Sequence, residues 1–82
     1  MVSLRNDIFQ RLRLLLVESL GAEEEEIDWE TNVYDDLNAD VLEFHDEVVP
    51  LIEETFKVKV DNEEVADLTT VRELVDYLAE NT

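Results

Sequence analysis

Four oxygen-bearing side chains near the middle of the chain are spaced like the calcium ligands of an EF-hand loop. Such a loop takes ligands at positions one, three, five and twelve. Counted from Asp36, these positions hold Asp36, Asn38, Asp40 and Glu47. Position six requires glycine for a sharp turn, but here it holds Val41, whose β-branched side chain resists a positive φ. The pattern therefore predicts no specific metal site, only weak divalent cation binding by these four residues.

A general base is the one catalytic group that the sequence offers. His45, the single histidine, stands beside Asp46. The chain shows no pattern for a nucleophile, an oxyanion hole or a glycine-rich phosphate loop. Glu53 and Glu54 are adjacent, so their side chains diverge on a helix and make a poor acid–base pair. We therefore expect no enzymatic activity and interpret His45 as a half-exposed helix residue.

Acidic residues dominate the chain and are unevenly distributed. Twenty-three acids and six bases give a net charge of −17, and fifteen of the acids fall in the span from Leu14 to Phe56, which has no lysine or arginine. Such a surface repels nucleic acids and anionic lipids and attracts basic protein patches. We expect protein partners, and neither nucleic acid nor membrane; the alternative is that the acids only keep the domain soluble. The expected partner contacts are Asp40, Glu43, Asp46, Glu47, Glu53 and Glu54.

Length and composition favour a single small domain spanning residues 1–82. Because there is no cysteine, neither disulfides nor thiolate metal sites can support the fold. The core must come from aliphatic packing. No apolar run approaches the roughly 20 residues that cross a bilayer, and the N-terminus lacks the pattern of a secretory signal. We expect a cytoplasmic monomer.

Apolar spacing predicts a first helix that begins after a Ser3 cap and ends before Gly21, the only glycine. Apolar residues recur along it at steps of three and four. This stripe comprises Leu4, Ile8, Leu12, Leu15, Leu16 and Leu20. Arg5, Arg11 and Arg13 on the same helix are expected to pair with acids elsewhere in the fold.

A long loop is predicted for residues 22–38. Its four consecutive glutamates, Glu23 to Glu26, indicate a solvated segment. Loops of this length tend to be functional or packed by their own side chains. The residues expected to hold this loop on the core are Ile27, Trp29, Val33, Tyr34 and Leu37.

A second helix is predicted from Asp40 to Phe56. Asp40 is a natural N-cap, with Glu43 as the other half of a capping box. Pro50 conflicts with this helix because it lacks an N–H and clashes with the preceding turn. We expect a bend near Val49; the alternative is a break and a new helix that starts at Pro50. The expected buried stripe is Leu42, Val49, Ile52 and Phe56.

The remainder of the chain predicts a connector and two further helices. Residues 56–60 alternate like a strand, but no partner strand exists, so we interpret them as an extended connector. A short third helix is predicted from Asp61 to Leu68, capped by Asp61 or Asn62. Thr70 starts the last helix, with Glu73 completing a capping box. The buried stripe of this helix is Val71, Leu74, Val75 and Leu78.

A family resemblance is carried above all by the segment Asp36-Leu37-Asn38-Ala39-Asp40-Val41-Leu42. It resembles the signature of acyl carrier proteins, in which Asp-Leu-Gly-Ala-Asp leads into Ser-Leu. The end of the second helix (53–56) and the last helix (70–78) match as well, so the resemblance covers nearly the whole chain. It implies an all-α four-helix bundle with a long first loop and a short third helix. It also implies an acidic second helix that docks onto basic patches of partner enzymes.

The resemblance implies a phosphopantetheine arm, but the serine that carries it is absent. In acyl carrier proteins the hydroxyl of that serine holds the arm as a phosphodiester. Anchored on Asp40, the position falls on Val41; counted back from Phe56, the segment is one residue too long and the position falls on Leu42. Neither side chain can be modified, so we expect no cofactor. The extra residue and Pro50 together indicate a remodelled start of the second helix.

Three functions remain open. We favour an acyl-carrier-protein-like domain without the modifiable serine, acting as an acidic protein-docking module related to fatty acid and polyketide carrier proteins. The first alternative is a functional acyl carrier protein of fatty acid or secondary-metabolite biosynthesis, with its natural serine replaced or with a different attachment logic. The second alternative is an acidic domain that responds to divalent cations.

Overall fold

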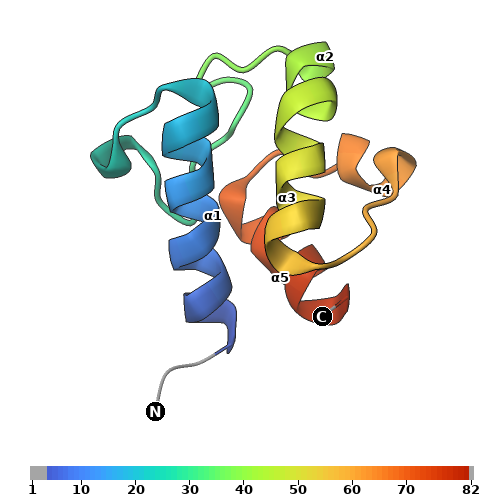
Figure 1. Ribbon diagram of the computed structural model, residues 1–82. Coiled ribbons are helices and arrows are strands. Elements are labelled where there is room, and N and C mark those ends of the chain that lie inside the picture. Colours follow the sequence, from blue (N-terminus) through green and yellow to red (C-terminus); the bar gives the residue numbers. More distant parts are fainter. Residues whose placement is uncertain (1–3, 82) are drawn as a thin grey trace.

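The helices expected from apolar spacing pack against one another in the structure, a computed structural model that describes residues 4–81 (Figure 1). In chain order the elements are α1 (Leu4–Leu20), η1 (Glu24–Glu26), α2 (Val41–Glu43), η2 (Phe44–Val48), α3 (Val49–Phe56), α4 (Asn62–Ala66) and α5 (Val71–Asn81). The long helix α1 lies against α3 and α5. Residues 4–81 contain an isolated β-bridge but no strand. The predicted all-α bundle, with a long first loop and a short helix before the last one, is confirmed.

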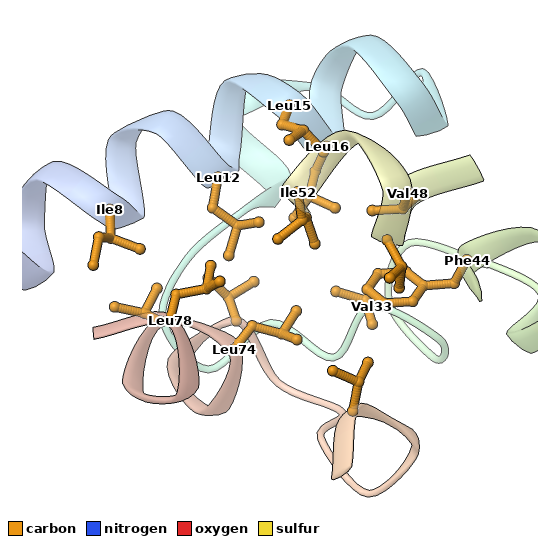
Figure 2. Close-up of a cluster of buried hydrophobic side chains, with 14 of the residues drawn as sticks. Ile8, Leu12, Leu15, Leu16, Val33, Phe44, Val48, Ile52, Leu74 and Leu78 are labelled. Carbon is orange, nitrogen blue, oxygen red and sulfur yellow. The ribbon is translucent and has the colours of Figure 1, made fainter. Parts of the chain in front are cut away.

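One hydrophobic core joins the helices to the first loop. Figure 2 shows side chains from α1, η2, α3 and α5 pointing toward one another, with Val33 of the loop among them. Leu12, Leu16, Val33 and Phe44 are fully buried. Burial of one such side chain contributes roughly 1.5–3 kcal/mol relative to leaving it exposed. The core therefore fixes where the second helix begins relative to α1 and the loop.

The first helix follows the prediction at its C-terminal end. Gly21 takes a φ of 70°, and its N–H donates to the Val17 carbonyl at 3.1 Å. Leu4, which the apolar spacing places in the buried stripe, is exposed at the start of the helix. The predicted Ser3 cap lies outside the described residues. Within residues 4–81, no helix has the length and apolar character of a membrane span.

The arginines of α1 find different partners. Arg5 forms an ion pair with Asp76 of α5, whereas Arg11 pairs at 3.3 Å with Asp7, one turn earlier on its own helix. Among the described residues Arg13 forms no ion pair. The predicted pairing with acids elsewhere in the fold therefore holds for Arg5 alone.

The long first loop is packed onto the core by its own side chains. Trp29 stacks on Phe9 of α1 with ring centroids 4.4 Å apart. Tyr34 packs edge-on against Phe44 at 5.6 Å, and burial raises the pKa of the Tyr34 hydroxyl. The glutamate run forms the short turn η1. Every predicted anchor of the loop is buried or half-buried: Ile27, Trp29, Val33, Tyr34 and Leu37.

The second helix runs without a break from Val41 to Phe56 (Figure 1). Its middle, η2, is π-helical. In η2 the Val49 N–H reaches back to the Phe44 carbonyl, five residues away instead of four. Pro50 is the second residue of α3. Pro50 directly follows the π turn, and this wider turn relieves the clash of the proline ring with the carbonyl before it. The predicted helix is confirmed; the alternative break at Pro50 is not formed.

The buried stripe of this helix differs from the prediction at one residue: Val49 and Ile52 are buried and Phe56 is half-buried as expected, but Leu42 is exposed. Continued α-helical spacing would turn His45 and Leu42 inward, four and seven residues before Val49. The π-helical segment shifts the phase by one residue, so Phe44 and Val48 are buried instead, while Leu42 is 74% exposed. Burying phenylalanine in place of histidine avoids desolvating a polar ring. The prediction that Leu42 belongs to the core is wrong for this reason.

The C-terminal elements follow their predicted caps. The Asp61 side chain accepts the Glu63 N–H at 2.8 Å and starts α4. The Thr70 hydroxyl accepts the Glu73 N–H at 3.2 Å, and Glu73 Oε1 accepts the Thr70 N–H at 3.2 Å, which completes the predicted capping box. Hydrogen bonds from Thr70 and Thr69 lower the pKa of Glu73. Residues 58–61 form the expected connector without a strand.

Candidate functional site

The segment before the second helix is a tight loop held by its own backbone. The Asp36 carboxylate accepts the Asn32 N–H at 2.9 Å, and the Ala39 N–H donates to the Val33 carbonyl at 3.2 Å. Asn38 takes a left-handed φ of 58°. Asparagine is one of the few non-glycine residues that adopt this conformation readily. Asn38 therefore fits the place where the acyl carrier signature has glycine.

Asp40 sets the first residue of the second helix. Its backbone is extended, and its Oδ1 accepts the Leu42 N–H at 2.8 Å. The Phe44 N–H donates to the Asp40 carbonyl at 2.8 Å. In the described part of the chain, Glu43 makes no return bond to the Asp40 N–H, so the predicted capping box is only half formed. Val41 is thereby fixed as the first helical residue.

Two aliphatic side chains stand exposed at this helix start. Val41 is 52% and Leu42 is 74% exposed. The sequence identifies both as alternatives for the missing serine, but their exposure as a contact surface is not among its predictions. This exposure could have been found in the sequence. Phe44 and Val48 are apolar and four residues apart, so they define an alternative buried face that leaves Leu42 outside.

No group at this position fits a phosphopantetheine arm. The phosphodiester needs a hydroxyl oxygen, which neither Val41 nor Leu42 has. Ser19 is on α1, where its hydroxyl donates to the Leu15 carbonyl at 2.7 Å. The residues present at the helix start can make hydrophobic contacts, but they cannot form that bond.

The six predicted contact acids are not equivalent. Five of them are exposed: Asp40, Glu43, Asp46, Glu47 and Glu54. Glu53 is half-buried, and its Oε2 accepts the Val60 N–H at 2.8 Å. Within residues 4–81 no ion pair involves any of the six, since the three pairs formed use acids elsewhere. Glu53 thus ties the helix to the connector, while the other five face solvent around Val41 and Leu42 or along the same helix.

The calcium-like spacing does not assemble a metal site. The Asp36 and Asp40 carboxylates accept backbone N–H groups at 2.9 and 2.8 Å, and Val41, the position that should turn sharply, begins a helix instead. In the described range no three histidine, aspartate or glutamate side chains could hold a metal ion. His45 is half-exposed as expected, with Nδ1 at 3.4 Å from Asn62 Oδ1.

The comparison with known families agrees with this geometry. Residues 10–78 match the family model described as the phosphopantetheine attachment site. The match includes the capped start of the second helix and most of the core that supports it. The chain therefore belongs to the phosphopantetheine attachment-site family, with the helical bundle of an acyl carrier protein.

Proposed function

We propose that this chain is a docking member of the carrier family, which binds partner proteins through its second helix and carries no covalent arm. The observation that carries the proposal is the exposed aliphatic pair Val41 and Leu42 at the capped helix start. The family has its attachment site at the start of the second helix. In this chain Val41 and Leu42 stand there, and their side chains can make hydrophobic contacts but have no hydroxyl.

The π-helical segment supports Val41 as the attachment position. A π turn takes one residue more than an α turn over the same part of a helix. The chain has one residue more than the family pattern between Asp40 and Phe56, and η2 lies between them. A π turn that takes up the extra residue downstream of Val41 supports the alignment anchored on Asp40 at the helix start.

The surroundings of the aliphatic pair suit a protein partner. Interfaces concentrate their binding energy in a desolvated apolar centre, while charges at the rim mainly raise the association rate. Among residues 4–81 Leu42 is the most exposed large apolar side chain. Glu43, Asp46 and Glu47 follow it and have no ion-pair partners in the same range. The fitting partner has an apolar pocket with a basic rim, as expected of enzymes that dock onto acidic carrier proteins.

Binding kinetics test this proposal with a partner purified from the native host. Leu42→Ala should weaken binding roughly tenfold or more, mainly by faster dissociation. Charge reversal at Glu47 and Glu54 should slow association, and added salt should slow it for the natural chain. Leu4→Ala is the matched control, because Leu4 is similarly exposed but lies on α1. Binding that is independent of salt and of all these changes would exclude this surface.

A functional carrier protein is the second candidate, and the family match over residues 10–78 favours it. In that case a hydroxyl outside the motif would hold the arm. Intact-mass analysis of the protein isolated from its native host separates the two candidates. A mass equal to the sequence supports the docking role, whereas an added phosphopantetheine supports the carrier role.

A further inference from the structure

A shallow groove between α1 and α3 lies outside the candidate site described above. Its volume is about 270 Å³, and its lining residues are Arg11, Leu14, Leu15, Glu18, Leu51 and Thr55. Leu14 is 53% and Leu51 is 41% exposed. Two of the five exposed large apolar side chains of the described residues therefore meet in one groove.

The two sides of this groove differ in charge. α1 carries three bases and two acids, whereas Val41–Phe56 carries five acids and no lysine or arginine. The groove is therefore bordered by the one helix of this chain on which a second chain with the same net charge of −17 meets the least repulsion.

The groove-lining residues of α1 run from a base through two leucines to an acid. Arg11, Leu14, Leu15 and Glu18 stand at i, i+3, i+4 and i+7, on one stripe of the helix. When a second copy of the helix is placed antiparallel to the first, its arginine lies opposite the glutamate of the first copy, and its two leucines lie opposite the two leucines of the first copy in reverse order. Arg11 and Glu18 are about 10.5 Å apart along the axis, so two antiparallel copies of α1 align both charged pairs at once.

We propose that the groove binds a second copy of this chain, with α1 antiparallel to α1 of the other copy. Arg11 of each copy, which also pairs with Asp7 of its own helix, then faces Glu18 of the other. The exposed Leu14 side chains pack near the two-fold axis, while Leu15 stays in the core. This is an isologous interface, which uses the same patch twice. A parallel arrangement is unfavourable because it brings Arg11 beside Arg11 and Glu18 beside Glu18.

The net charge determines when this dimer forms. Two chains of −17 repel over their whole surfaces, and salt screens this long-range repulsion more than it weakens ion pairs in contact. The dimer therefore forms at high protein concentration, and its fraction rises between low and moderate ionic strength. The monomer expected from the sequence is the species at low salt.

Sedimentation velocity of charge-swapped variants tests the arrangement. Arg11→Glu alone and Glu18→Arg alone each place like charges opposite one another in the antiparallel dimer, so each should weaken dimerisation about tenfold or more. In a parallel dimer like charges already face each other, so neither single change would weaken it. Lys59→Glu and Glu25→Arg make the same changes in net charge away from the groove and serve as matched controls.

Two further samples restore the attraction. An equimolar mixture of the two single variants places opposite charges at both contacts between unlike copies, and it should dimerise at least as well as the natural chain. The double variant, with Arg11→Glu and Glu18→Arg in one chain, exchanges the two charges without changing the net charge. It should dimerise like the natural chain, because each contact again joins a base and an acid.

The sedimentation results support or overturn the antiparallel dimer as follows. Dimerisation of the mixture and of the double variant, with monomeric single variants, supports the proposal, and it also shows that the variants are folded. A natural chain that stays monomeric at millimolar concentration in 0.3 M salt overturns it. Two other results also overturn it: dimers that persist in both single variants, or a mixture whose dimer fraction does not exceed that of either variant alone. In either case the occupant of the groove would be another protein.

Discussion

The N–H of Leu42 donates to Oδ1 of Asp40 at 2.8 Å, and this bond places Val41 at the first position of the second helix. The cap and the core act together here. Asp40 fixes the start of the helix, while Phe44 turns into the core and directs Val41 and Leu42 outward. The exposed aliphatic pair is thus a consequence of local capping and of the π-helical segment that follows.

Removal of this cap should destabilise the domain. Asp40→Ala leaves the Leu42 N–H without its side-chain acceptor, so we expect the free energy of unfolding to fall by about 1 kcal/mol. Asp40→Asn should retain most of the stability, because asparagine caps as well as aspartate. Urea denaturation of the three proteins measures the difference. Equal stability of the alanine variant and the natural chain would mean that the cap does not hold the helix start.

Glu53 and its neighbour Glu54 should behave differently although they are chemically identical. Glu53→Gln keeps an acceptor for the Val60 N–H, whereas Glu53→Ala leaves that N–H unsatisfied and should cost about 1–3 kcal/mol of unfolding free energy. Glu54→Ala is the matched control and should change stability by less than about 0.5 kcal/mol. Equal effects of both alanine variants would contradict the structural role assigned to Glu53.

The capping box at α5 should make stability sensitive to acid. Hydrogen bonds from Thr70 and Thr69 lower the pKa of Glu73 below its ordinary value of 4.5. A carboxylate with a lowered pKa in the folded state stabilises the fold above its unfolded-state pKa, and this contribution is lost as pH falls through the folded-state pKa. The stability difference between the natural chain and Glu73→Gln should therefore shrink as the pH falls from neutral through the folded-state pKa. A difference that stays constant or grows would contradict this linkage.

Local patterns that depend on neighbouring residues could be predicted from the sequence. Gly21 ends α1 in the left-handed region, Asp61 caps α4, and Thr70 with Glu73 forms its box, because each motif is complete within a few residues. For the second helix the sequence predicts the right bounds and the burial of Val49 and Ile52, but it wrongly places Leu42 in the core. The π turn coincides with the burial of Phe44, which packs edge-on against Tyr34 of the preceding loop.

At the candidate site, too, local sequence patterns could not predict contacts that form only in the folded chain. Asp40, Glu43, Asp46 and Glu47 are exposed as expected, whereas Glu53 finds a backbone partner seven residues ahead that only the folded connector supplies. The exposure of Leu42 also follows from the helix phase, which the spacing of Phe44, Val48 and Ile52 indicates but the competing spacing of Leu42, Val49 and Ile52 does not.

The most direct test of the central claim is the intact mass of the chain after incubation with coenzyme A and a promiscuous phosphopantetheinyl transferase. The natural chain should keep its mass, because the helix start offers no hydroxyl. Val41→Ser should gain the arm, since Asp40 places position 41 first in the helix, and Leu42→Ser should not. Modification of Leu42→Ser alone would move the attachment position by one residue, whereas modification of the natural chain would contradict the account.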